Sequence, residues 1–233
     1  MRNRLLRTFA FLLFALCHLP AQAQYPANIK PERLRAEVAR MLEAPRPEKA
    51  DVVFAGSSTI RGWASLSSDL PGLDLIRNGV AGLTLPDLQY YLNELVLRWQ
   101  PSTIVIYAGD NDIGMYGATA AQVRDAYSSL TQAIHAQRPG CRIFYLSIKP
   151  SPKRNKKWPL MQEANALIAA QADPAQALYF VDVSAGMLSA DGLPRAELYA
   201  ADGLHMNRRG YAEWVAPIRS ALEAHSGMLI RSE

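Results

Sequence analysis

The sequence predicts an α/β domain built on a five-stranded parallel sheet with helices on both faces. Three observations lead to this prediction: five short apolar runs, amphipathic stretches between them, and small or polar residues directly after several of the runs. Repeated alternation of strand and helix is typical of a parallel sheet that helices cover on both sides. No linker interrupts residues 50–225, so we expect a single domain over residues 50–233.

The five apolar runs are the predicted strands. They are short and rich in β-branched and aromatic residues, which is typical of strands buried on both faces. In chain order they are Val52–Ala55, Leu73–Ile76, Ile104–Ala108, Ile143–Ile148 and Leu178–Val183.

Helical periodicity precedes the first strand and recurs between and after the others. Thr84 and Asp87 have the spacing of a capping box, with Pro86 in the first turn, while Thr119 and Asn207 are expected to cap later helices. An apolar stripe at helical spacing marks each of residues 33–43, 88–99, 123–134, 161–168 and 211–222.

The first 23 residues predict an export signal. A basic start, an apolar run over residues 9–16 and small residues at 21 and 23 suit cleavage before Gln24. The run is too short for a permanent membrane-spanning helix, which leaves a tethered amphipathic start as the alternative. A lipid anchor on Cys17 is not expected, because bulky Leu16 precedes it. We therefore expect an exported protein, periplasmic or secreted, with residues 24–49 as a leader and helix before the domain.

Charge and cysteine content exclude several classes of protein. The chain has 25 basic and 21 acidic residues, but the signal segment carries three arginines and no acid, so the mature chain is almost neutral. We therefore expect neither a nucleic-acid partner nor a stable membrane anchor after cleavage. Only Cys141 remains in the mature chain, which rules out an internal disulfide and argues against a structural zinc site.

Residues able to carry chemistry follow the predicted strands. Such residues occur in four blocks: Gly56-Ser57-Ser58-Thr59, Asn78–Gly82, Gly109–Asp112 and, before the last helix, Asp202–His205. Ligands of open α/β sheets bind beyond the carboxyl ends of the strands, so we expect the four blocks to meet there.

These residue types suit nucleophilic catalysis. A serine such as Ser58 needs a base to take its proton, and His205 is a natural base. Asp202, three residues earlier, is close enough to orient the imidazole. Gly82 and Asn111 are placed to supply N–H donors to a developing oxyanion.

Together the four blocks resemble the SGNH (GDSL) hydrolase superfamily of esterases and lipases. The resemblance implies a flavodoxin-like three-layer α/β/α sandwich, with neither metal nor cofactor. It assigns Ser58 as the nucleophile and Asp202 and His205 as its triad partners. It also assigns the oxyanion hole to the N–H groups of Ser58 and Gly82 and the amide of Asn111. Ser57 stands where the family motif usually has Asp, which affects loop geometry and substrate preference rather than the triad.

Each block has a structural alternative. Ser58 alone could be a helix N-cap, and Asn111 or the Asp202-Gly203 pair alone could be turn residues. The basic segment, Lys149 to Lys157, is either a solvated loop, which we favour, or a rim that attracts an anionic substrate. Trp63 and Trp158 are either core residues or a flat wall for a substrate, and His135 and His225 are expected to be exposed bystanders.

The sequence thus predicts an exported serine esterase that cleaves carboxylic esters through an acyl-enzyme on Ser58. A small ester, a lipid or an acetylated polysaccharide would suit as substrate. Two alternatives remain open: an acyltransferase that moves acyl groups to or from a glycan, and a non-catalytic glycan-binding domain. The Gly-x-Ser-x-Gly elbow of α/β-hydrolases is absent from the chain, which disfavours that fold.

Overall fold

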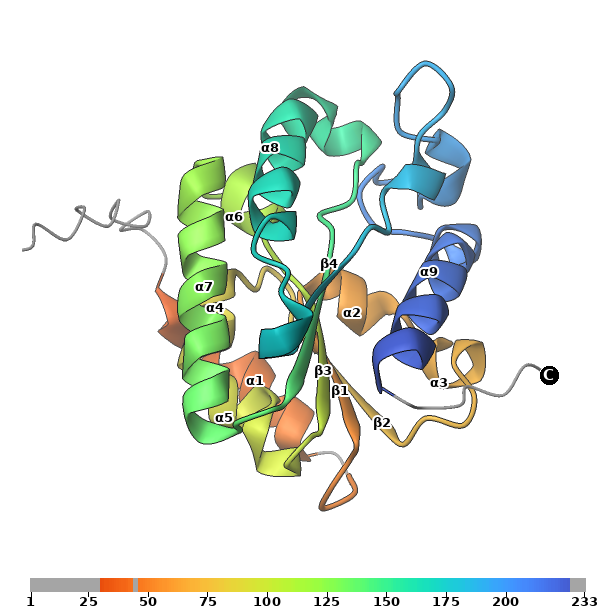
Figure 1. Ribbon diagram of the computed structural model, residues 1–233. Helices are drawn as coiled ribbons and strands as arrows, with labels where there is room; N and C mark the ends of the chain where they lie inside the picture. Colours follow the sequence, from red (N-terminus) through yellow and green to blue (C-terminus); the bar gives the residue numbers. More distant parts are fainter. Residues whose placement is uncertain (1–29, 44–45, 227–233) are drawn as a thin grey trace, which may run out of the picture.

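A computed structural model describes residues 30–43 and 46–226 (Figure 1). The predicted export signal, the first residues of the leader and residues 227–233 lie outside the described part. As predicted, five parallel strands form one sheet, and their order is β2-β1-β3-β4-β5. The strands are β1 (Val52–Gly56), β2 (Leu75–Gly79), β3 (Thr103–Tyr107), β4 (Arg142–Leu146) and β5 (Leu178–Val181).

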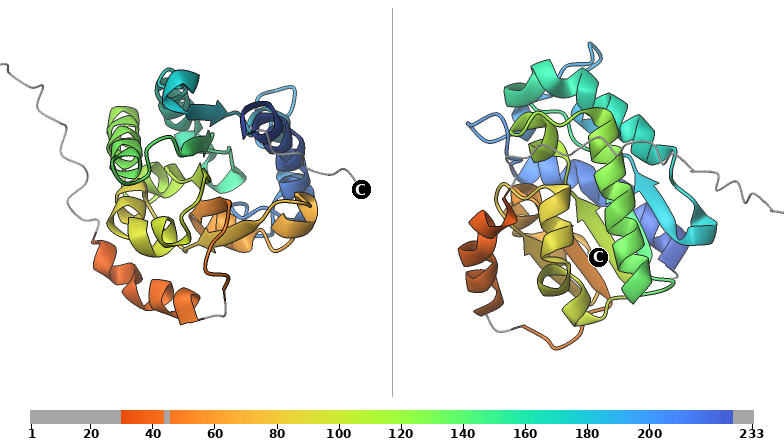
Figure 2. Two further views of the ribbon diagram at one scale, coloured as in Figure 1. Left: turned by 60° about the horizontal axis from the view of Figure 1, so that its bottom comes forward. Right: turned by 90° about the vertical axis from the view of Figure 1, so that its left-hand side faces the viewer.

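Helices cover both faces of the sheet and complete the three-layer sandwich (Figures 1 and 2). One face carries α1 (Arg35–Glu43), α4 (Leu85–Tyr90), α5 (Leu92–Leu95), α6 (Asp110–Gly114), α7 (Ala120–Gln137) and α8 (Trp158–Ala169). The other carries α2 (Ser58–Gly62), α3 (Leu66–Asp69) and α9 (Arg208–Ser226). Short 3₁₀ turns cover Pro31–Leu34, Leu97–Trp99, Pro152–Lys157, Pro174–Gln176, Ala185–Met187 and Ala196–Leu198.

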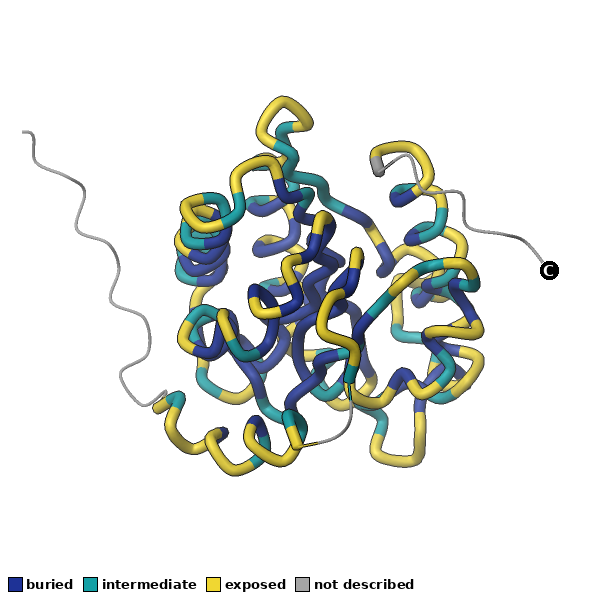
Figure 3. Tube along the Cα trace, turned by 90° about the horizontal axis from the view of Figure 1, so that it is seen from below, coloured by how far each residue is buried: buried dark blue, intermediate teal, exposed yellow. Residues whose placement is uncertain are grey.

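The core consists of two apolar layers, one on each side of the sheet. Successive side chains of a strand point to opposite faces. In β1, Val53 and Ala55 join one layer, and Val52 and Phe54 join the other, all fully buried. Figure 3 shows the buried chain concentrated at the centre of the molecule.

The edge strands differ from the prediction. The second strand begins at Leu75 rather than Leu73 and continues through polar Arg77 and Asn78. Both β2 and β5 lie at an edge of the sheet and keep several half-buried residues, so they are not buried on both faces. An edge strand pairs on one side only, which allows polar residues where a central strand would exclude them.

The stripe over residues 88–99 does not form one continuous helix. The chain makes α4, then α5, then a 3₁₀ turn that ends at Gln100 in the left-handed region. The capping box of Thr84 and Asp87 is present, and Thr119 caps α7 as predicted. Asn207 opens α9 by accepting hydrogen bonds from the backbone N–H groups of Arg209 and Gly210.

Strand register brings three of the four polar blocks to one edge of the sheet. Gly56, the last residue of β1, lies beside Gly79 of β2 and Tyr107 of β3. The chain leaves β1 toward β2 on one side and reaches β3 on the other, so this edge is a topological switch point, where open α/β sheets bind ligands. Within the described residues, no helix has the length and apolar character needed to cross a membrane.

Candidate active site

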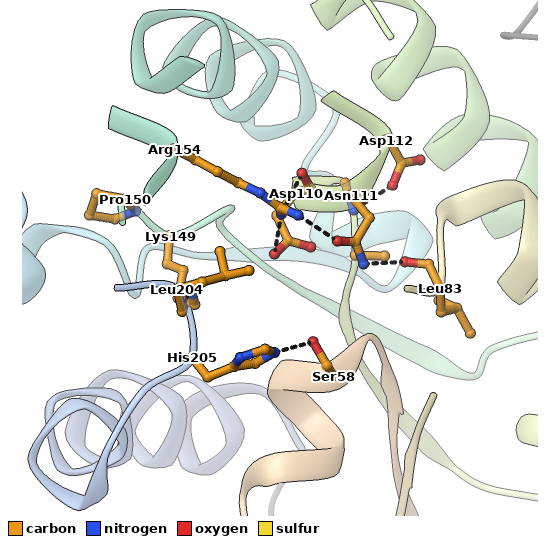
Figure 4. A network of polar contacts seen from close by, with 12 residues as sticks. Ser58, Leu83, Asp110, Asn111, Asp112, Lys149, Pro150, Arg154, Leu204 and His205 are labelled. Carbon is orange, nitrogen blue, oxygen red and sulfur yellow. Dashed lines mark hydrogen bonds and ion pairs between the residues drawn. The ribbon is translucent and has the colours of Figure 1, made fainter. Parts of the chain in front are cut away.

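Ser58 is the first residue of α2, directly after the turn that leaves β1. Gly56 adopts a φ of +156°, and a Cβ there would lie 2.0 Å from the carbonyl oxygen of Tyr107, so only glycine fits this close approach of β1 to β3. Ser58 does not cap its helix, because the capping position is Ser57. Its Oγ instead lies 3.0 Å from Nε2 of His205 (Figure 4).

His205 and Asp202 lie in the tight loop that precedes α9. The other ring nitrogen of His205, Nδ1, lies 2.5 Å from Oδ2 of Asp202. The second carboxylate oxygen, Oδ1, accepts hydrogen bonds from the backbone N–H groups of Leu204 and His205, at 2.9 and 3.0 Å. Ser58, His205 and Asp202 thus form one hydrogen-bonded row from residues far apart in the chain.

Hydrogen bonds hold the Asp202 carboxylate in its ionised form. The His205 ring makes the largest contribution and the two backbone N–H groups add to it, so the pKa of Asp202 lies well below its usual range. A carboxylate that stays charged near neutral pH keeps the proton of the neutral imidazole on Nδ1. This leaves the Nε2 lone pair facing the Ser58 hydroxyl.

Asn111 lies in the first turn of α6, directly beyond β3, and is 4% exposed. Its Nδ2 donates to the carbonyl oxygen of Leu83 at 3.0 Å, and its Oδ1 accepts from the Arg154 guanidinium at 3.0 Å (Figure 4). Because an amide nitrogen carries two protons, one N–H of Asn111 is left for a ligand after the bond to Leu83.

Gly82 lies in the loop after β2, with a φ of +70° that favours glycine. Contacts from the N-terminal helical segment hold this loop. Glu37 accepts from the backbone N–H of Ala81 at 2.9 Å, and Arg33 donates to the carbonyl oxygen of Gly82 at 2.9 Å. The Leu83–Asn111 hydrogen bond then joins this loop to α6, so the predicted oxyanion residues lie on connected elements.

Ser57, which replaces the usual motif Asp, is completely buried. Its Oγ has no hydrogen-bond partner among the described residues. Oδ1 of Asp110 is likewise buried and has no hydrogen-bond partner within this part of the chain. The two adjacent serines therefore have opposite surroundings, since Ser58 is half-buried and bonded to His205.

Two cations of the basic segment, Lys149 and Arg154, are buried. For these two residues, both sequence interpretations, a solvated loop and a substrate-attracting rim, are wrong. Lys149 is 2% exposed, and its Nζ donates to the carbonyl oxygen of Leu204 at 2.7 Å. The Arg154 side chain is 10% exposed and bonds to Asp110 and Asn111. Lys153, Lys156 and Lys157 are exposed, as a solvated loop predicts.

Burial lowers the pKa of Lys149 to about 8, with the carboxylates of Asp110 and Asp202 opposing the shift and Arg154 adding to it. Sequence reasoning did not identify Lys149 and Arg154 as part of the site. Their place directly after β4, at the edge where the other blocks meet, was the signal that could have identified them.

The remaining candidates are structural. Trp63 is completely buried and donates from Nε1 to Asp69, and Trp158 is 6% exposed, so the two do not form a substrate wall. His135 is half-buried and lies 2.9 Å from the carbonyl oxygen of Cys141, rather than being a free surface residue. His225 is exposed and stacks on Tyr179. Within the described residues, no cluster of three His, Cys, Asp or Glu side chains could hold a metal ion.

Comparison with known proteins identifies the family of the chain. The model of the GDSL-like lipase/acylhydrolase family matches residues 28–213. The chain belongs to this family. The matched region of this GDSL-like protein includes α1 and all four blocks. No curated protein sequence matches the chain.

Solved structures share its fold. A GDSL-like lipase from Bacteroides thetaiotaomicron is 24% identical, with a TM-score of 0.63, and the match covers 84% of this chain and 98% of the lipase. The Clostridium thermocellum family 3 carbohydrate esterase is 17% identical, with a TM-score of 0.61, and the match covers 77% of this chain and 98% of the esterase. An acetyl esterase variant, solved with an acetate ion, is 16% identical, with a TM-score of 0.59, and the match covers 76% of this chain and 97% of the acetyl esterase.

Proposed function

We propose that this GDSL-like protein is a serine esterase that hydrolyses carboxylic esters through an acyl-enzyme on Ser58. The observation that carries the proposal is the continuous row in which His205 lies 3.0 Å from Ser58 and 2.5 Å from Asp202. This is the arrangement in which a serine hydroxyl becomes a nucleophile at neutral pH.

The proposed reaction has two halves. Ser58 Oγ attacks the ester carbonyl while His205 Nε2 takes its proton, and Asp202 stabilises the imidazolium that forms. The backbone N–H groups of Ser58 and Gly82 and the amide of Asn111 bind the negative oxygen of the tetrahedral intermediate. His205 then protonates the leaving alcohol. Water, activated by the same histidine, releases the acid and restores Ser58.

We propose short acyl groups on bulky alcohols, such as acetylated glycans, as the substrate class. The side chains of His205 and Asp202 are 42% and 41% exposed, so the side of the triad that meets the leaving group is open to solvent. A large alcohol can approach an open triad without entering a cavity. A carbohydrate esterase and an acetyl esterase are among the proteins whose fold resembles that of this chain, so the fold is compatible with this substrate class.

We also propose that the protein acts outside the cytoplasm. The basic, apolar and small-residue pattern of residues 1–23 supports export, and polymer esters are then accessible substrates.

A chain-length series of nitrophenyl esters, measured beside acetylated glycans, tests the proposal. We expect turnover that decreases from acetyl to octanoyl esters and that falls at least about a thousandfold in Ser58→Ala. Ser57→Ala is the matched control, one residue away, and should retain turnover. Full turnover in Ser58→Ala refutes the mechanism, whereas a preference for octanoyl esters refutes only the substrate class. Addition of excess glycan shows, by a transfer product, whether the acyl-enzyme also serves as an acyltransferase.

A further inference from the structure

Arg154 extends from the 3₁₀ turn after β4 to the amide of Asn111 (Figure 4). Its Nη2 donates to Asn111 Oδ1 at 3.0 Å, and its Nη1 donates to the backbone carbonyl oxygen and to Oδ2 of Asp110, at 2.8 and 3.1 Å. The guanidinium thus contacts two consecutive residues of the first turn of α6, one of which is the proposed oxyanion donor.

An asparagine amide has two orientations of almost the same shape, related by a half-turn that exchanges Oδ1 and Nδ2. Only one of them can serve an oxyanion, because the other directs carbonyl lone pairs at the negative charge. Arg154 has donors only, and the carbonyl oxygen of Leu83 has lone pairs only. In the observed orientation Asn111 satisfies both neighbours, whereas the half-turn would set donor against donor and acceptor against acceptor.

The guanidinium is itself held in place. The Arg154 side chain is 10% exposed and forms an ion pair with Asp110. Gly114, at the end of α6, leaves the space that it occupies: a Cβ at this position would lie 2.5 Å from Arg154 Nε and 2.7 Å from Cδ and Cζ. A fixed, planar cation is better suited to orient an amide than a mobile ammonium.

We propose that Arg154 is a positioning residue, which locks the Asn111 amide with Nδ2 toward the oxyanion. The proposal rests on the esterase function proposed above. Arg154 acts through Asn111 and does not touch the reacting atoms. Its charge also polarises the amide, which strengthens the remaining N–H as a donor.

Steady-state kinetics of Arg154→Met, Arg154→Lys and Lys156→Met form the first test. Lys156 is an exposed cation in the same turn and is the matched control. We expect Arg154→Met to lower kcat about tenfold or more, within the cost of losing one oxyanion donor, and to change KM less than twofold. Arg154→Lys should recover part of kcat, and Lys156→Met should match the wild type. Equal kcat values for Arg154→Met and Lys156→Met would overturn the proposal.

The double variant Asn111→Ala/Arg154→Met separates positioning from a general structural effect. If Arg154 acts only through Asn111, its loss in the Asn111→Ala background changes kcat no further. A double variant whose loss equals the product of the two single losses would contradict the proposal.

An NMR measurement makes the outcome independent of catalysis. The Asn111 side-chain NH₂ pair, assigned by its disappearance in Asn111→Asp, should exchange slowly with solvent in the wild type and in Lys156→Met. In Arg154→Met we expect it to shift and to exchange faster. An unchanged pair in folded Arg154→Met overturns the positioning role even if the wild type cleaves no ester. Absence of Ser58-dependent turnover together with a shifted pair counts against the esterase function only.

Discussion

The two sides of the candidate site are built differently. On the acid–base side, the side chains of Asp202 and His205 are about two-fifths exposed, and short-range hydrogen bonds within one loop hold them together. On the oxyanion side, Asn111 and Asp110 are nearly completely buried, and long-range contacts from Arg154 join α6 to the segment after β4. Lys149, buried in the same segment, bonds instead to Leu204, beside His205. The comparison teaches that the Asp202–His205 pair is oriented by local hydrogen bonds, whereas Asn111 is oriented by tertiary packing. Substitutions on the two sides should therefore differ in their effect on stability.

The largest expected effect on activity comes from Asp202→Asn. An asparagine amide can donate to Nδ1 and thereby stabilise the wrong imidazole tautomer, so kcat should fall by about 10³-fold or more. Because Asp202 is exposed, we expect Tm to change little. Ester kinetics and thermal unfolding of the same preparation check both expectations. A kcat within tenfold of the wild type would remove Asp202 from the mechanism.

Asn111→Ala should reduce both activity and stability. Loss of one oxyanion donor lowers kcat by about 10²–10³-fold. The substitution also removes the Asn111 partner of one buried Arg154 N–H and of the Leu83 carbonyl oxygen, which costs about 1–3 kcal/mol of unfolding free energy. Urea unfolding measures this cost. An Asn111→Ala protein as stable as Asp202→Asn would contradict the contrast between the two sides.

Lys149→Met should change how the unfolding free energy depends on pH. The folded-state pKa of Lys149 is about 8, below the ordinary value of 10.5, so the unfolded chain binds more protons between these values. The charged, buried ammonium destabilises the folded state by about 3 kcal/mol below pH 8. This penalty disappears as the pH rises from 8 to 10.5, so the unfolding free energy increases over that range. The unfolding free energy of the wild type, relative to that of Lys149→Met, should therefore increase between pH 8 and 10.

Lys149→Met should also lower kcat several-fold, because it removes the hydrogen bond to Leu204, the neighbour of His205. Lys156→Met, which changes an exposed cation, is the control for the pH series. A stability difference between wild type and Lys149→Met that stays constant from pH 7 to 10 would show that the Lys149 ammonium is not perturbed by burial.

The smallest effect is expected for Ser57→Ala. The Ser57 hydroxyl is buried and has no partner within the described residues, so its removal sacrifices no hydrogen bond. We expect kcat within twofold of the wild type and an equal or slightly higher Tm. A large loss of activity would mean that the hydroxyl has a role that its surroundings do not indicate.

The sequence predicted the local features and the general architecture, but it missed several tertiary contacts at the site. Strand centres, the caps at Thr84 and Thr119 and the order of the four blocks follow from short patterns of residue type. The grouping of Ser58 with Asp202 and His205 was also predicted, through the resemblance of the four blocks to the SGNH hydrolases. The roles of Lys149 and Arg154 were not, because a run of basic residues looks the same whether its members are solvated or buried. Only the fold decides which of them turn inward.

Covalent labelling with a fluorophosphonate, followed by peptide mass spectrometry, tests the central claim most directly. The reagent requires an activated serine, so we expect a single adduct on Ser58, with labelling at least about a hundredfold slower in His205→Ala. An adduct on Ser57 or another serine, or labelling of Ser58 at the same rate without His205, would contradict the hydrogen-bonded row on which the proposed mechanism depends.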